Sequence, residues 1–141
     1  MGDVTARVKL IEGIQMLGES GSGHSLVMDG STAVGGRNMG VRPMELLLIG
    51  MGGCSAIDVL NILRKGRHGV TDCDVSLSGV RTDSEPAVFE EITVHYKVTG
   101  KGLPEKAVQR AIKLSKEKYC SASAMLEKSA EIKTSYEIIE A

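Results

Sequence analysis

The sequence predicts an α+β fold in which helices cover an antiparallel sheet, with elements in the order βββ-α-ββ-α-α-β. Apolar residues alternate with polar ones, as in strands, in six segments: three near the N-terminus, two in the middle and one at the end. Two segments with helical periodicity and a short third one separate these groups. Because 141 residues is the length of one domain, we expect residues 1–141 to form a single domain.

The N-terminal part is predicted to be a three-stranded meander. Apolar residues alternate from Val4 to Leu10, and two more short strands are expected at residues 14–17 and 24–28, separated by a glycine-containing turn. The stretch 29–41 is too rich in glycine to hold regular structure. We expect it to be a surface loop.

A long helix is predicted from Pro43 to about Lys65, because proline is favoured at the first helical position. This segment is apolar nearly all round, which predicts a central helix that packs on more than one face. Its interior contains three glycines, each of which costs about 1 kcal/mol relative to alanine. Close approach by another backbone or a ligand would compensate for them. These glycines flank Cys54: Gly50, Gly52 and Gly53.

The remaining elements follow from alternation and from a second helical stripe. Strands are predicted at residues 73–80 and 89–98, followed by an amphipathic helix from about 102 to 118. A short helical piece, SASAMLEKS, leads into a final strand that contains Ile132 and Ile138. The later helices should therefore lie between the second strand of this group and the last one.

Composition argues against two classes of partner and favours a cytoplasmic protein. A net charge of -1, with no block of like charges, leaves no basic patch for nucleic acid. The apolar stretch 46–63 approaches the length of a membrane span, but Asp58 and Asn61 interrupt it, so we expect no membrane. The N-terminus lacks the apolar run and cleavage site of a signal peptide.

The three cysteines do not have the spacing of a metal site or of a structural disulfide framework. Cys54, Cys73 and Cys120 form no CxxC pair, and the three histidines show no HxxxH spacing. We therefore expect no metal and no cofactor. In a reducing cytoplasm an odd number of cysteines argues that any disulfide is transient.

Each cysteine has a structural and a chemical interpretation. Cys54 lies mid-helix, four residues before Asp58 and on the same face, although free cysteines often pack simply as small apolar groups. Cys73 points to the apolar face of its strand, which favours core packing. Cys120 lies between two helices, where free backbone N–H groups would stabilise a thiolate.

Glu45 is the candidate carboxylate, and its position implies a second subunit. It stands nine residues before Cys54, half a turn away and roughly 13 Å along a straight helix, so the two cannot touch within one chain. A neighbouring copy of the helix could bring them together, which implies a homodimer. The simpler interpretation of Glu45 is a first-turn acid that interacts with the helix dipole.

Two segments resemble the OsmC/Ohr family, most closely its YhfA-like branch. VRPMELLLIGMGGCSA resembles the central-helix signature of that family, and Tyr119-Cys120-Ser121 resembles its second cysteine site. The resemblance implies an intertwined homodimer in which the sheet wraps around long central helices, with active sites at the interface. It assigns Cys54 as the peroxidatic cysteine, Cys120 as the resolving cysteine and Glu45 as the catalytic carboxylate.

The resemblance further implies a thiol-dependent peroxidase that reduces organic hydroperoxides in the response to oxidative stress and is restored by a dithiol reductant. Active members pair the carboxylate with an arginine, for which Arg37 and then Arg42 are the candidates here. Two alternatives remain. The apolar helix could line a pocket that binds a hydrophobic small molecule without turnover, or the thiols could serve as a redox sensor.

Overall fold

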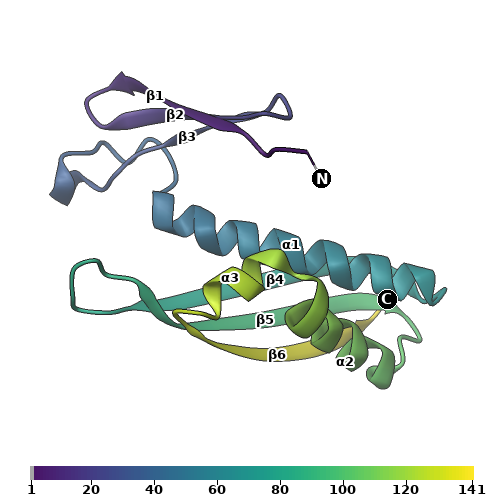
Figure 1. The fold of residues 1–141 in the computed structure, drawn as a ribbon. Helices are drawn as coiled ribbons and strands as arrows, with labels where there is room; N and C mark the ends of the chain where they lie inside the picture. The colour runs from purple at the N-terminus through teal and green to yellow at the C-terminus, as the bar shows by residue number, and fades with distance from the viewer. Residues whose placement is uncertain (1) are drawn as a thin grey trace. The chain divides into compact units, whose positions relative to one another are not determined.

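A computed structural model describes residues 2–141, which fall into two units (Figure 1). One unit ends at Leu47 and the other spans Leu48–Ala141. The elements follow the predicted order of strands and helices, which confirms the α+β class. That the whole chain folds as one domain stays a prediction.

The first unit contains the predicted three-stranded meander. Strands β1 (Ala6–Glu12), β2 (Gln15–Ser20) and β3 (Ser25–Met28) pair antiparallel in the order β1-β2-β3. The glycine-rich loop that follows holds one short 3-10 turn, Thr32–Val34. The buried carboxylate of Asp29 organises this loop by accepting three backbone N–H groups. The donors belong to Gly30, Arg37 and Met39.

Helix α1 spans Pro43–Lys65 and starts as the sequence predicts, with proline as its first residue. Glu45 is the third residue, and its side chain accepts the backbone N–H of Arg42 at 2.8 Å. This contact satisfies an N–H that the helix itself cannot, as in one half of a capping box. Arg64 and Lys65 occupy the last turn, where cations favour the helix dipole.

The second unit holds a three-stranded sheet with helices in its crossover connection. Strands β4 (Gly69–Arg81), β5 (Phe89–Lys101) and β6 (Glu131–Glu140) lie in the order β4-β5-β6. The chain between β5 and β6 forms helix α2 (Glu105–Leu114), a single π-helical turn at residues 115–119 and helix α3 (Ser121–Leu126).

One detail of the predicted sheet is wrong, because this sheet is not entirely antiparallel. Strands β4 and β5 pair antiparallel, whereas β6 pairs parallel with β5, with Ile92 opposite Ile132. Parallel neighbours need a long crossover connection, usually a helical one. The segment 102–130 supplies that crossover, so the chain re-enters the sheet from the same end.

The core of the second unit lies between one face of the sheet and the helices (Figure 1). Alternate residues of β5 point to this face and are almost fully buried, as the two-residue period of a strand requires. The residues from β5 are Ile92, Val94, Tyr96 and Val98, those from α1 are Met51, Val59 and Leu63, and those from α2 are Val108, Ala111 and Ile112.

Within the second unit, helix α1 packs against strand β4 and against the crossover segment, and packing on a further face stays a prediction. A Cβ atom at Gly52 would lie 2.6 Å from a Leu77 methyl carbon, so this glycine permits close packing on β4. A Cβ at Gly50 or Gly53 would meet nothing within 4 Å. By length and composition α1 could cross a membrane, a test that core helices of soluble proteins also pass.

The buried face of β5 should carry much of the stability of this unit. Val98 is 0% exposed and Val80, on the neighbouring strand, is 51% exposed. Val98→Ala should lower the free energy of unfolding by about 2 kcal/mol, because it removes buried methyl groups and leaves a cavity. Val80→Ala should change it by less than about 1 kcal/mol. Urea unfolding measures the free energy of unfolding of both variants. An equal decrease in the two variants would contradict this position of the core.

Candidate functional site

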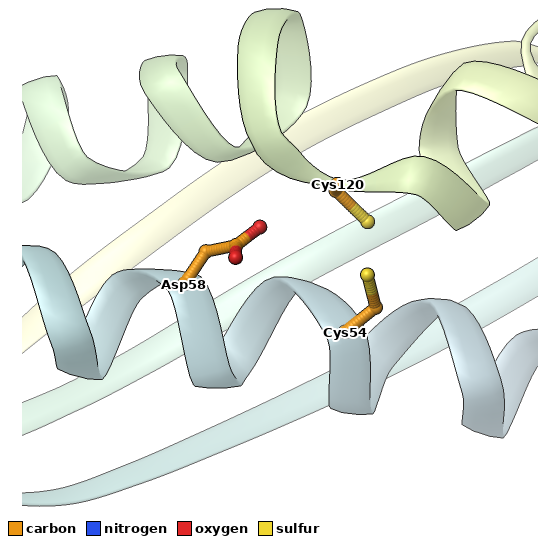
Figure 2. A group of neighbouring side chains, drawn as sticks. All are labelled: Cys54, Asp58 and Cys120. Atoms are coloured by element: carbon orange, nitrogen blue, oxygen red, sulfur yellow. The ribbon is translucent and has the colours of Figure 1, made fainter. Parts of the chain in front are cut away.

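Cys54 and Cys120, 66 positions apart in the sequence, lie side by side in the second unit. Figure 2 shows their sulfur atoms pointing toward one another, with the carboxylate of Asp58 beside them. The two sulfurs and a carboxylate oxygen of Asp58 all lie within 4.8 Å of one another. Within residues 2–141 this is the one group of three or more such side chains close enough to share a metal ion.

Helix α1 positions two of the three groups. Asp58 follows Cys54 by four residues, so both project from the same face, as the sequence predicts. Both side chains are half-buried. They therefore face the crossover segment while part of each remains open to solvent.

Cys120 is held by the junction between the π-helical turn and α3. Its backbone N–H donates to the carbonyl of Ser115 at 2.8 Å, which closes the wide turn. Its sulfur accepts the backbone N–H of Ser123 at 3.4 Å and so caps α3. Its thiol also reaches the carbonyl oxygen of Met51 on α1 at 4.0 Å. These contacts aim the sulfur at α1.

A buried chain of hydroxyl groups supports Asp58. The Ser115 hydroxyl donates to Oδ2 of Asp58 at 3.0 Å, and it bonds the Ser55 hydroxyl at 2.8 Å. Ser55 in turn bonds the Tyr96 hydroxyl at 2.6 Å. Each hydroxyl has one proton, so the donation runs from Tyr96 through Ser55 and Ser115 to the carboxylate. Because the protons are donated in this direction, the Asp58 carboxylate is the final acceptor of the hydrogen-bonded hydroxyl groups.

Burial and nearby groups oppose each other at Cys120. Burial, with the side chain only 2% exposed, is the main cause that raises the pKa of this thiol above its ordinary value. Hydrogen bonds from Ser123 act in the opposite direction, and the neighbouring Cys54 raises the pKa further. The predicted N–H donor is thus present at the helix junction, but burial outweighs it.

The other sequence candidates lie elsewhere. Glu45 is exposed and belongs to the first unit, where it caps α1. Arg37 bonds Glu12 and Gln15, and Arg42 bonds Asn38, all within that unit. The catalytic role predicted for Glu45 stays a prediction.

The third cysteine, Cys73, lies half-buried on β4. Burial is the main cause that raises its pKa, and the adjacent carboxylates of Asp72 and Asp74 raise it further. Each of these causes, among residues 2–141, disfavours a thiolate at Cys73. This environment agrees with the packing role expected from the sequence.

Asp58 is the residue that the sequence interpretation undervalued. Its spacing of four residues from Cys54 is the available sequence signal, and this spacing predicts only that the two side chains share a face. The sequence contains no pattern that predicts the hydroxyl chain, because its members come from three separate elements: Ser55, Ser115 and Tyr96.

A pocket of about 480 Å³ opens beside Asp58, between the second half of α1 and α2. Lys65 and Arg110 line it together with Asn61 and Tyr119. Neither cation takes part in an ion pair among residues 2–141. The carboxylate next to the two sulfurs is therefore reachable from solvent through a polar opening.

The family model described as OsmC-like protein matches residues 35–135. The chain therefore belongs to the OsmC family, as its sequence segments indicated.

Within the family the chain is similar to Protein YhfA of Escherichia coli, with 49% identity over 96% of this chain and 98% of YhfA. A hypothetical protein from Aquifex aeolicus has a similar structure, with a TM-score of 0.88 and 35% identity over 100% of this chain and 99% of the other. An organic hydroperoxide resistance protein from Elizabethkingia anophelis shares the fold at 15% identity, with a TM-score of 0.74 over 100% and 98% of the two chains.

The raised pKa of Cys120 predicts slow alkylation at neutral pH. A higher pKa leaves less thiolate, and thiolate is the reactive form. Iodoacetamide should label Cys120 in the reduced protein more slowly at pH 7 than it labels free cysteine, and the rate should rise about tenfold per pH unit while the thiol remains mostly protonated. Peptide mass spectrometry after timed labelling measures this. Labelling of Cys120 at pH 7 as fast as free cysteine would contradict the effect of burial.

Proposed function

We propose that this protein is a thiol-dependent peroxidase that reduces organic hydroperoxides, with Cys54 as the peroxidatic cysteine and Cys120 as the resolving cysteine. The observation that carries the proposal is the placement of the two sulfurs within 4.8 Å of one another. Membership of the OsmC family supports it, because a protein with the same fold is named for organic hydroperoxide resistance.

The catalytic cycle needs three steps. The thiolate of Cys54 attacks one peroxide oxygen; an S–O bond forms, the O–O bond breaks, and the alkoxide takes a proton and leaves as an alcohol. The thiol of Cys120 then loses its proton and attacks the sulfur of the sulfenic acid; the S–S bond forms and water leaves. A dithiol reductant restores both thiols by exchange and is itself oxidised to a disulfide.

The burial of the two cysteines supports this division of roles. A peroxidatic cysteine must meet a substrate that arrives from solvent, and Cys54 is the half-buried member of the pair. Cys120 is only 2% exposed and contacts α1, so it is placed to meet Cys54 rather than a diffusing peroxide. A disulfide needs the sulfurs about 2.05 Å apart. The oxidised state therefore requires a modest shift of the crossover segment.

Asp58 serves in this proposal as the proton acceptor beside the thiols. Its carboxylate lies next to both sulfurs, and the hydroxyl chain that ends on Oδ2 holds it in place. Glu45, with Arg37 or Arg42, would act across a subunit interface as the family resemblance implies. In such a dimer, Glu45 of one subunit would lie near Cys54 of the other, because the two residues cannot touch along one straight helix.

The alternative function for the same thiols is a redox sensor. A sensor differs from a peroxidase because it does not consume hydroperoxide continuously when reductant is supplied. The alternative of a hydrophobic ligand has less support at this site, because charged side chains line the pocket beside Asp58. We also propose a cytoplasmic location, since all three cysteines are free thiols.

Replacement of each cysteine should give a distinct result with a hydroperoxide and a dithiol reductant. Cys54→Ser should reduce peroxide consumption to the rate seen without protein, because the nucleophile is absent. Cys120→Ser should form the sulfenic acid at Cys54, and further peroxide should then convert it to sulfinic acid. Consumption of cumene hydroperoxide measures the first effect, and intact mass measures the second.

Cys73→Ser is the matched control, because this cysteine lies outside the pair, and it should keep the full rate. The proposal fails if Cys54→Ser consumes hydroperoxide as fast as the parent protein. Oxidation of the parent protein without turnover, under a continuous supply of reductant, would instead support the sensor.

We propose further that a second copy of the chain covers the exposed apolar face of α1. Ile49 and Ile57 are 55% and 60% exposed, although such side chains are usually buried. Gly50 and Gly53 lie on the same part of the helix, with open space where a Cβ would be. Small residues between exposed isoleucines let two helices approach closely. A twofold axis would pair this face with itself.

Ile57→Glu should convert the dimer to a monomer, because it would place a charge in an apolar interface. Light scattering coupled to size exclusion measures the mass, which should fall from two chains to one. Val80→Glu, at an exposed position on β4, is the control and should remain dimeric. A parent protein that elutes as one chain, or that is recovered in the membrane fraction, would contradict the proposal.

A further inference from the structure

We infer that the reduced site binds one zinc ion through Cys54, Asp58 and Cys120. The sequence lacks every usual zinc spacing and therefore predicts no metal site. The structure nevertheless brings together two thiols and a carboxylate, the donor types found in zinc sites, from two elements that are distant in sequence.

The geometry lies close to what a tetrahedral ion requires. Zinc bonds to sulfur and oxygen are about 2.3 and 2.1 Å long, so the donor atoms of a tetrahedral site stand about 3.6–3.8 Å apart. The three donor atoms here are all within 4.8 Å of one another. A contraction of about 1 Å or less completes the site. Three protein ligands would leave the fourth position for water or a small anion.

The hydroxyl chain is the support that a metal ligand needs. Metal-binding carboxylates are usually themselves hydrogen-bonded, which fixes their orientation. Ser115 donates to Oδ2 of Asp58, and no hydrogen bond from residues 2–141 reaches Oδ1, which an ion could therefore bind. Ser55 and Tyr96 hold Ser115 in turn. Asp58 is therefore oriented before any ion arrives.

Charge and access also suit a cation at this position. Binding deprotonates both thiols and releases two protons, because thiolates are the ligands. Two thiolates, one carboxylate and Zn²⁺ leave one net negative charge. Lys65 and Arg110 line the pocket that opens beside Asp58 and would offset this charge. The same pocket provides an entry path for the ion.

Zinc binding and disulfide formation exclude each other, because the sulfurs of a disulfide are no longer thiolates. The ion would therefore occupy only the reduced protein and block attack on peroxide. Binding itself does not depend on peroxidase activity, whereas the inhibition rests on the proposed function.

The test is a titration of the reduced protein with Zn²⁺ against a chromophoric chelator. We expect one Zn²⁺ per chain, no binding after oxidation, and binding that is unchanged in Cys73→Ser. Ser115→Ala should raise the dissociation constant by about 10–100-fold, since it removes a hydrogen bond to a ligand. Asp58→Asn should raise it at least as much. Mg²⁺, which prefers oxygen ligands, should not compete.

A second measurement uses the unaltered protein and so does not depend on how the variants fold. Co²⁺ in place of zinc should give a sulfur-to-metal charge-transfer band in the near ultraviolet, and oxidation should abolish it. A missing band, or zinc binding that survives in Cys54→Ser, would overturn the inference. If zinc binds as described but the reduced protein consumes no hydroperoxide, the metal site stands and the peroxidase proposal fails.

Discussion

The contact between α1 and the segment that joins α2 to α3 is the constraint on which the site depends. Cys120 touches the Met51 carbonyl, and Ser115 reaches both Ser55 and Asp58 on the helix. These are polar contacts inside an otherwise apolar interface. An unpaired hydroxyl or carboxylate there would cost free energy. The register between helix and crossover segment is therefore fixed closely enough to bring two thiols together.

The π-helical turn has a clear part in this arrangement. An α-helical continuation of α2 would give residues 115–120 a different path, whereas the wide turn bonds the Cys120 N–H to the Ser115 carbonyl. Such turns occur often at functional sites. The turn lets one short segment supply Ser115 to the hydroxyl chain and, five residues later, the sulfur of Cys120.

The sequence predicted what depends on local spacing. The proline start of α1, the shared face of Cys54 and Asp58, and the helix junction at Cys120 all follow from patterns a few residues long. The parallel pairing of β6 was missed, because strand direction depends on how the whole crossover packs. The hydroxyl chain and the closeness of the two sulfurs also depend on tertiary contacts. Only the family resemblance, and no spacing, pointed to that pairing of cysteines.

The redox pairing of Cys54 with Cys120 is measured most directly by a peptide map of the reduced protein after one equivalent of an organic hydroperoxide, made under non-reducing conditions. We expect one crosslinked product that joins the Cys54 and Cys120 peptides of the same chain, with Cys73 still a free thiol. Crosslinks through Cys73, or stable oxidation of Cys54 with Cys120 unchanged, would show that the two neighbouring sulfurs do not act as a redox pair.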